Sequence, residues 1–561
     1  MSDSKRMNPM KKYLKYYVMA LLLLSANACT DLEENMYDTI VTDEFYGNKN
    51  EVLSAVLRPY THASAWITSS GQVGWWRASE LSADQLAWPV KGVHGQDGFQ
   101  WVRLHYHTWT EDDDVVWAPW RLMWWGLGLC TDPIDNLEKR SVQEMGITEA
   151  EKAAFIGELK LLRALHYLKI MDLWGNVPIP AYIGEVSPKT RPRAEVFAYI
   201  EKEILDNIDN VPPLSTAMTG RMSQAGGYAM LVELYLNAEK WTGTERWDDC
   251  IAAADKLISS AAGGQNGAME LDPNITDQFK PDNHKSKEVL FAISYNTQTS
   301  NNAPPFPADF FYFDQRAIYG GTRDGNDGVV LVPGVYTTYN DDDLRKTEWL
   351  LEGPQFKYGT TDVPVLGRYE YANQPLVFVD NIRKNKEAAT NGTDPELLVS
   401  NMLNGEENSG VRFNKYKLGV APTVDAVNGS SSYNSTDWNV YRLTWIYFAK
   451  AEALMRKNGN IANQAAVDLI NTCKKRAFTE DTWPAHEYTI ATLTLDELLA
   501  ERGREFIFEG FRRQDLIRFG KFTTTSWWDH APTAITRELF NIPQRQRTLN
   551  PNLEQNDGYI K

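Results

Sequence analysis

The tryptophans between residues 66 and 125 are the first candidates for chemistry in this chain. Ten of its 19 tryptophans fall in this stretch. An exposed indole offers a broad apolar face and one N–H donor, which suit the C–H face and the hydroxyl groups of a sugar ring. Five of the ten stand among glycines and a proline, where no helical stripe would bury them: Trp75, Trp76, Trp88, Trp101 and Trp109. We therefore predict a glycan site that includes Trp75, Trp76, Asp84, Trp88 and Trp101, with packing of these rings under loops as the alternative.

Three further tryptophans follow a different pattern. Trp117, Trp120 and Trp124 recur at intervals of three and four residues after the acidic run at residues 111–114. Acidic residues are typical of a helix N-terminus, and this spacing is typical of one buried helical face. We expect these three side chains to pack in the core.

A second glycine-rich loop, residues 309–328, combines aromatic rings with charged hydrogen-bonding groups. It contains Tyr312, Asp314, Arg316, Tyr319 and Arg323. Aromatic faces together with bidentate hydrogen-bonding side chains suit polyols. We predict that Tyr312, Asp314 and Arg323 contact the ligand. Calcium binding is an alternative, but no motif supports it, because the loop lacks the one-three-five spacing and the distal Glu of an EF-hand.

The charged series at residues 501–518 alternates carboxylates and arginines within a few helical turns. Glu501 lies three residues before Arg504, and Glu509 lies three and four residues before Arg512 and Arg513. Pairs at this spacing are neighbours on one helix face and more often fix local structure than do chemistry. We predict a structural role here and no catalytic residue in the chain.

A helical glycoside hydrolase or lyase is a rival interpretation, because such an enzyme would also be rich in tryptophan, acidic and secreted. It needs two carboxylates about 5 to 9.5 Å apart across a cleft. The best pair in the sequence is Glu80 with Asp84, but their spacing makes them neighbours on one helix face. The sequence therefore favours a binding protein over an enzyme.

Histidines offer one possible metal site. His105 and His107 would share a face of a strand, with His94 nearby in the sequence. No cysteine and no capped histidine helix completes a tetrahedral set, so we predict no metal and no cofactor.

Helical patterns dominate the elements that must position these residues. Thr148 and Glu151 form a capping box before a buried helix that ends near Trp174. Two helix pairs follow, at residues 226–261 and 441–477. In the second pair Ala453 and Ala465 have the spacing of the two small contact positions in a tetratricopeptide hairpin. Long segments rich in glycine, proline and asparagine separate the helices, and residues 329–332 and 376–379 are candidate short strands.

The N-terminus has the order of a secretory signal. Basic residues precede an apolar run at residues 16–24, which is too short to span a bilayer, and small residues precede Cys29. Small residues before a cysteine resemble a bacterial lipobox, with plain secretory cleavage as the alternative. We predict that residues 1–28 are removed and that Cys29 carries the lipid. The acidic residues 30–34 resemble the signal that sends Bacteroidetes lipoproteins to the outer face of the outer membrane.

Charge and cysteine content narrow the possible partners. The formal net charge of −17 disfavours nucleic acids and anionic lipid surfaces. Only Cys130, Cys250 and Cys473 remain after Cys29, which allows at most one disulfide, and Cys250 and Cys473 lie in helical patterns typical of buried free thiols.

Five motifs in order resemble the SusD/RagB family of surface lipoproteins. "LLRALHYLKIMDLWGNVPI" (residues 161–179) resembles the Arg-Ala-x-x-Tyr helix of the family, and "WIYFAKAEALMRKNG" with "LINTCKKRA" resembles its Ala-Glu-Ala helix and the Arg-Ala that follows. "ERGREFIFEGFRRQDLIRFGKF" (residues 501–522) and "FNIPQRQRTLNPNLEQNDGY" (residues 540–559) resemble its C-terminal motifs.

This resemblance implies a mainly α-helical fold, with tetratricopeptide-like hairpins, long loop-rich insertions and a few short strands. It implies a lipid-anchored protein on the extracellular face of the outer membrane. Such a protein binds nutrient, commonly glycan, and delivers it to a SusC-like TonB-dependent transporter, without catalysis. A peptide-binding lid of the same transporter type is the alternative. We expect four regions: a signal peptide at 1–28, a lipid-proximal tether at 29–45, an N-terminal helical region with the tryptophan-rich loops at 46–280, and a C-terminal region at 281–561.

Overall fold

The structure, a computed structural model, describes residues 45–68, 73–182, 184–295, 312–314, 317–318, 325–391, 394–417 and 436–560. Cys29 and the predicted leader lie outside the described residues. No described helix is both long enough and apolar enough to cross a membrane.

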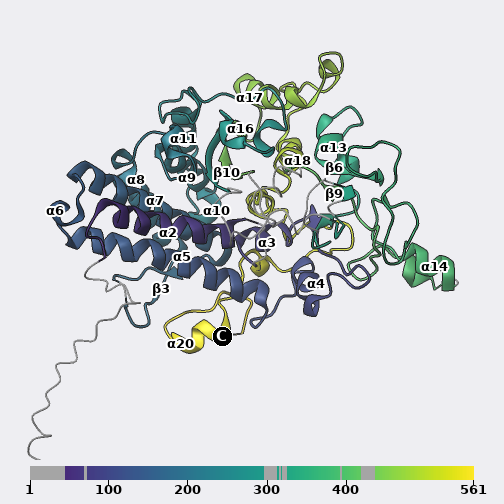
Figure 1. The fold of residues 1–561 in the computed structure, drawn as a ribbon, viewed down its shortest axis with the longest axis horizontal. Helices are drawn as coiled ribbons and strands as arrows, with labels where there is room; N and C mark the ends of the chain where they lie inside the picture. Colours follow the sequence, from purple (N-terminus) through teal and green to yellow (C-terminus); the bar gives the residue numbers. More distant parts are fainter. Residues whose placement is uncertain are drawn as a thin grey trace, which may run out of the picture.

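Long helices that pack side by side form one layer of the molecule (Figure 1). They are α2 (Lys49–Ile67), α5 (Asp114–Lys139), α7 (Glu149–Trp174) and α8 (Arg193–Asn207). The predicted capping box begins α7: the Glu151 amide donates to Thr148 Oγ1 at 3.1 Å, and the Thr148 amide donates to the Glu151 carboxylate at 2.8 Å. Gly175 follows the last turn at a positive φ of 68°, which glycine adopts at little cost.

Both predicted helix pairs are present, and they pack against each other. The first pair is α9 (Gln224–Leu236) and α11 (Trp247–Ile258), joined through the short α10 (Ala238–Thr242); the second is α16 (Leu443–Lys457) and α17 (Gln464–Lys474). Because α11 contacts both α9 and α16, the pairs form one helical stack (Figure 1). After this stack the chain forms α18 (Leu495–Phe506), α19 (Arg512–Arg518) and α20 (Gln544–Leu549).

One expectation about the second pair is wrong by one residue. Ala453 is fully buried, but Ala465 is exposed and Ala466 is the buried small residue of α17. A shift of one position on a helix turns a side chain by about 100°, which moves Ala465 from the contact to the solvent.

The strands are short and each described sheet has two of them. The longest pair joins β4 (Val289–Ile293) to β10 (Trp438–Arg442) in antiparallel register. The two predicted strands are present as β5 (Val330–Leu331) and β8 (Val377–Phe378). The other strands are β1 (Leu86–Ala87), β2 (Val177–Pro178), β3 (Thr190–Arg191), β6 (Leu350–Leu351), β7 (Gly353–Pro354) and β9 (Arg412–Phe413).

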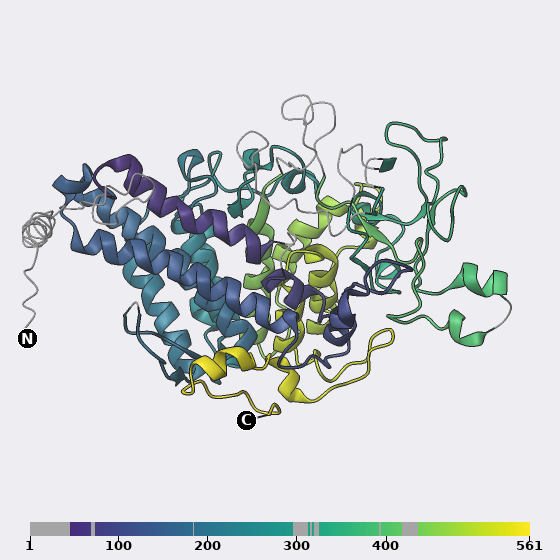
Figure 2. The same ribbon diagram turned by 60° about the horizontal axis from the view of Figure 1, so that its bottom comes forward.

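A loop-rich segment forms one end of the molecule. This segment contains α13 (Leu344–Glu348) and α14 (Asn385–Asn391), while α6 (Val142–Met145) lies at the opposite end (Figures 1 and 2). Two short N-terminal helices, α3 (Trp75–Glu80) and α4 (Gln100–His105), connect the long helices to this segment. Pairing of β1 with β5 ties the tryptophan-rich stretch to it directly.

The main hydrophobic core runs through both halves of the chain. It includes side chains from α2, α5 and α7 as well as from α16, α18 and the C-terminal segment. The predicted boundary near residue 280 stays a prediction. Cys130, Cys250 and Cys473 are buried free thiols, as expected for the last two.

Candidate functional site

The tryptophans predicted to form a stacking platform do not present free faces. Trp75 and Trp76 begin helix α3, and their exposed fractions are 2% and 0%. The Trp76 ring packs edge-on against Trp438, and its Nε1 donates to the Phe508 carbonyl at 2.8 Å. The partners come from more than 350 residues later in the chain, so the local glycine-rich sequence gives no sign of this burial. The premise that these indoles lie in open loops is wrong.

Trp88 and Trp101 stack on each other instead of on an open site. Their ring centroids are 4.6 Å apart and nearly parallel, and the Arg77 guanidinium lies about 5 Å from both rings. Gly328 closes another side, because a Cβ at that position would lie 2.5 Å from the Trp88 ring. Trp109, which we set beside them, is also buried and donates to the Tyr559 hydroxyl at 3.0 Å.

The helical tryptophans behave as expected in part. Trp120 is buried in the core, and Trp117 and Trp124 pack against it while remaining partly exposed. The most exposed indole of α5 is Trp125, at 51%, which contacts His62.

The best carboxylate pair for a hydrolase is not arranged for catalysis. Glu80 is fully buried and accepts a short hydrogen bond from the Gly510 amide, and burial raises its pKa to about 8. Asp84, also a predicted ligand residue, binds the Arg512 guanidinium through both oxygens at 2.6 and 2.8 Å. Arg512 on α19 thus engages the hydrogen-bonding groups that Asp84 was expected to offer to a sugar.

The histidines do not share a strand. His105 ends helix α4, and His107 follows it at a positive φ of 54°. His105 Nε2 contacts Asp529 at 2.7 Å, whereas His107 Nε2 bonds to the Ser82 carbonyl at 2.8 Å. Within the described ranges, no three His, Cys, Asp or Glu side chains converge as a metal site would require.

A different set of side chains forms the candidate site, which we call the aromatic face. Its centre is Phe313, whose ring stacks on His94 at 5.1 Å and packs edge-on against Tyr369 at 4.9 Å. His94 and Tyr369 also contact each other at 5.3 Å. The members of the aromatic face are Val93, His94, Phe313, Asp314, Tyr358, Arg368 and Tyr369.

A charged pair lies beside these rings. Arg368 forms an ion pair with Asp314 at 3.1 Å, and its guanidinium lies 5.7 Å from the centre of the Phe313 ring. The Arg368 side chain is 48% exposed and that of Asp314 is 17% exposed. An exposed guanidinium beside a partly exposed carboxylate supplies donors and acceptors for adjacent hydroxyl groups.

The exposed members of the face come from tight turns. Residues 91–94 form a two-residue hairpin, in which the Lys91 and His94 backbones exchange hydrogen bonds at 2.9 and 2.8 Å and Gly92 has a φ of 53°. This turn places Val93 at its tip, where it is 73% exposed. Tyr369 is 44% exposed and Tyr358 is 50% exposed. The Tyr358 amide donates to the Ala317 carbonyl, which holds its loop beside the segment of Phe313.

A buried lysine fixes the hairpin from below. Lys91 is 1% exposed, and its Nζ donates to the Gly328 carbonyl at 2.8 Å. Burial lowers the pKa of Lys91 to about 7, although the nearby Asp327 carboxylate opposes that shift. Gly328 also packs against the Trp88 ring, so this residue contacts both the stacked tryptophans and the lysine of the hairpin.

The sequence-predicted ligand residues thus fall into four groups. Asp314 lies on the aromatic face, whereas Tyr312 is buried beneath it with its hydroxyl bonded to Glu407. Arg323 lies outside the described residues. The four tryptophans and Asp84 are held elsewhere by packing and by Arg512. Sequence reasoning missed Arg368 and Tyr369, although residues 353–375 show the same signal as the 309–328 loop, with aromatic residues among glycines and prolines.

Comparisons with known proteins agree with the fold. The SusD family model matches residues 287–537. Starch-binding protein SusD of Bacteroides thetaiotaomicron is 26% identical over 452 residues, which are 74% of this chain and 75% of that protein. SusD-like protein P38 of Formosa agariphila is 22% identical and covers 98% of this chain and 100% of its own.

Solved structures show the same architecture over almost the whole length. A SusD homolog from Bacteroides thetaiotaomicron superposes with a TM-score of 0.69 at 18% identity, covering 93% of this chain and 99% of that one. Surface glycan-binding protein A from the same organism, solved with laminarihexaose, superposes with a TM-score of 0.66 at 19% identity, covering 91% and 99%. In its motifs, its tetratricopeptide-like helical fold and these matches, the chain is similar to proteins of the SusD/RagB family, whose model matches residues 287–537.

Proposed function

We propose that this chain binds a nutrient oligosaccharide or polysaccharide on the aromatic face. One observation carries the proposal: Tyr369 presents an exposed ring, packed against Phe313, next to the partly exposed Arg368–Asp314 pair. The ring suits the C–H face of a sugar, and the charged pair suits its hydroxyl groups. The relatives named above as starch-binding and glycan-binding proteins support the same ligand class.

The charge of the chain favours a neutral glycan. Its formal net charge is −17. Arg368 is the one arginine or lysine among the members of the aromatic face, and it already forms an ion pair with Asp314. A uronate or sulfate would face net repulsion and one preoccupied guanidinium.

Titration of the mature protein with a polysaccharide panel and an oligopeptide pool tests this proposal. The Tyr369→Ala variant should lose about tenfold in glycan affinity, the scale of one stacked aromatic contact, with a melting temperature near that of the wild type. Trp125→Ala is the matched control, because Trp125 is equally exposed but lies on α5 against His62.

Each alternative predicts a distinct result. Saturable binding of peptides with no glycan binding would support a peptide-binding lid, and new reducing ends would identify a hydrolase. Equal glycan affinity in the wild type and in Tyr369→Ala would remove the aromatic face as the site.

We also propose that the protein is anchored by a lipid on Cys29 to the extracellular face of the outer membrane and delivers its glycan to a SusC-like TonB-dependent transporter. The lipobox-like sequence and the similarity to SusD/RagB proteins support this arrangement. Mild detergent extracts should contain the chain together with a β-barrel of that type, through an interface well above ~1,000 Å². Cys29→Ala should move the protein into the soluble fraction, and consistent purification of the wild type alone would argue against the partnership.

A further inference from the structure

Two adjacent glutamates, Glu406 and Glu407, are buried behind the aromatic face. Each residue is 2% exposed. Burying a carboxylate is costly unless hydrogen-bond donors or cations replace its water. Neither side chain forms an ion pair with any residue that the structure describes, so backbone amides and tyrosine hydroxyls must supply this compensation.

Glu407 collects its donors from the turn that carries the exposed residues of the site. Its Oε1 accepts from the Arg368 amide at 2.6 Å, and its Oε2 accepts from the amides of Tyr369 and Tyr371 at 2.9 and 3.2 Å. Its Oε1 also accepts a short hydrogen bond from the hydroxyl of Tyr312, the residue before Phe313. One carboxylate thus holds both halves of the aromatic face: the 368–371 turn and the segment with Phe313.

Glu406 has a similar environment but a different target. Its Oε1 accepts from the Glu387 amide at 2.9 Å, and its Oε2 accepts from the Lys386 amide at 3.0 Å, both in the first turn of α14. Its Oε2 also accepts from the Tyr371 hydroxyl at 3.0 Å. Glu406 therefore fixes α14. Of the two glutamates, only Glu407 accepts hydrogen bonds from the backbone amides of Arg368 and Tyr369.

We propose that Glu407 is a positioning residue for ligand binding, one that sets the affinity of the aromatic face without touching the ligand. Three amides pointing at one carboxylate fix the backbone of the 368–371 turn, and this fixes where the Arg368 and Tyr369 side chains project. A turn ordered before binding loses less conformational freedom when the ligand binds. The inference rests on the proposed function of this face.

The experiment compares Glu407→Gln with Glu406→Gln. The NH2 group of a glutamine cannot accept hydrogen bonds from backbone amides. Each variant therefore loses some of the buried hydrogen bonds that its carboxylate accepted, and the two variants should lose comparable stability. Glycan affinity, measured well below both melting temperatures, should fall about tenfold in Glu407→Gln and less than about twofold in Glu406→Gln.

A second measurement separates positioning from general weakening. In a protein that already carries Arg368→Ala and Tyr369→Ala, adding Glu407→Gln should leave the remaining affinity unchanged, because the side chains it positions are gone. A further loss of about tenfold in that background would show that Glu407 acts in some other way and would overturn the inference.

Other outcomes are also decisive. If Glu407→Gln does not fold, Tyr312→Phe removes only one donor to Glu407 and should lower affinity about twofold to threefold. Equal affinity in Glu407→Gln and the wild type, with Tyr369→Ala impaired, would overturn the positioning role and leave the glycan site intact. Absence of glycan binding by the wild type itself would instead overturn the proposed function.

Discussion

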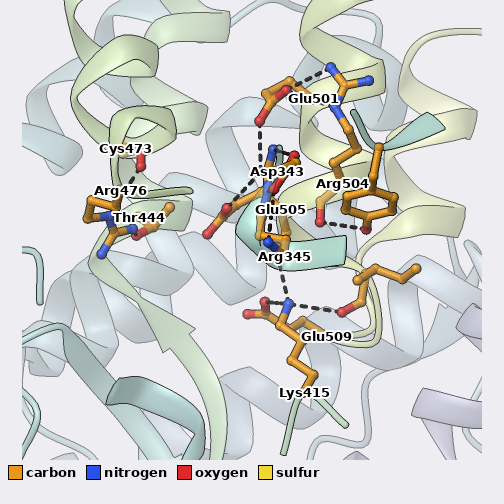
Figure 3. Close-up of polar contacts among 12 residues, drawn as sticks. Asp343, Arg345, Lys415, Thr444, Cys473, Arg476, Glu501, Arg504, Glu505 and Glu509 are labelled. Atoms are coloured by element: carbon orange, nitrogen blue, oxygen red, sulfur yellow. Dashed lines mark hydrogen bonds and ion pairs between the residues drawn. The ribbon is translucent and has the colours of Figure 1, made fainter. Parts of the chain in front are cut away.

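Two regions of this protein concentrate groups that could do chemistry, and they differ in what covers them. The first is the buried charge network, which comprises Asp343, Arg345, Lys415, Arg442, Glu501, Glu505 and Glu509 (Figure 3 shows most of it). The second is the aromatic face, whose Arg368–Asp314 pair reaches solvent. The residue types overlap, but the side chains of the network are buried, whereas turns leave the face open to solvent.

Pairing in the network is dense and continuous. Arg345 bonds to Glu501 at 2.8 Å and to Glu505 at 3.0 Å, and Arg442 bonds to Glu505 at 2.9 Å and to Glu509 at 2.8 Å. Lys415 closes the set by donating to Glu509 at 2.6 Å. Each carboxylate thus faces at least one cation, and the network connects α18 to β10, to α13 and to the loop around Lys415.

The pKa values show that burial alone does not determine the state of a carboxyl group. Burial by itself raises the pKa of Glu288, but Arg476 and Arg442 lower it to about 2. Glu80 is equally buried and forms no ion pair among the described residues, and burial raises its pKa to about 8. The comparison teaches that neighbouring cations decide the sign of the shift.

The largest expected effect comes from removing a cation from the network. Arg442→Met leaves Glu288, Glu505 and Glu509 with fewer partners and should lower the free energy of unfolding by about 3 to 5 kcal/mol. The same change on the aromatic face, Arg368→Met, breaks a half-exposed pair and should cost about 0 to 1 kcal/mol. Denaturant unfolding of both variants measures the difference. Similar losses in the two regions would show that the distinction drawn here between covered and open charges is mistaken.

Tryptophans provide the next test. Trp76→Ala removes a fully buried ring packed against Trp438 and Phe508 and should lower the free energy of unfolding by about 3 to 5 kcal/mol. Glycan affinity of the folded variant should remain that of the wild type. Trp125→Ala, on an exposed part of α5, should change stability by less than about 1 kcal/mol. A large loss of affinity in Trp76→Ala at unchanged melting temperature would restore Trp76 to the binding site.

The third test concerns the pH dependence of stability. In the folded protein Glu80 keeps its proton up to about pH 8. In the unfolded chain the same carboxyl group loses its proton near the ordinary pKa of 4.5. Between these values the folded state binds more protons than the unfolded state, so this residue makes stability fall as pH rises. Glu80→Gln should remove that fall, whose slope is at most about 1.4 kcal/mol per pH unit. The measurement is the free energy of unfolding of both proteins from pH 5 to pH 8. The same pH dependence in wild type and Glu80→Gln would refute the raised pKa of Glu80.

Local patterns were sufficient for much of the fold. The capping box of α7, both helix pairs and the short strands β5 and β8 formed where spacing and capping predicted them. Within the charged series at 501–518, the Glu501–Arg504 pair also formed at the predicted helix spacing. These features depend on neighbours within a few residues or on one helix face, which the sequence displays directly. The predicted pairing of Glu509 with Arg512 and Arg513 is wrong, because Glu509 lies between α18 and α19 and pairs with Lys415 and Arg442.

The site could be predicted only in part. The 309–328 loop contributed Asp314, and the same mixture of aromatic and glycine residues at 353–375 contributed Tyr358, Arg368 and Tyr369. The prediction for the tryptophans is wrong because glycine-rich surroundings do not by themselves expose a side chain. Phe508, Gly510 and Trp438 cover Trp75 and Trp76 from sequence distances that no local window contains.

The sequence by itself determined the helical class, the resemblance to the SusD/RagB family and the kind of residue that a glycan site would use, because capping, periodicity and motif order are local properties of the chain. Only the tertiary structure decided which aromatic rings are open. Exposure is a property of what packs against a residue, and here the groups that cover Trp75 and Trp76 come from β10 and from residues 508–511. The same packing buried Trp76 and left Tyr369 at the surface, with Glu407 behind it to hold its turn in place.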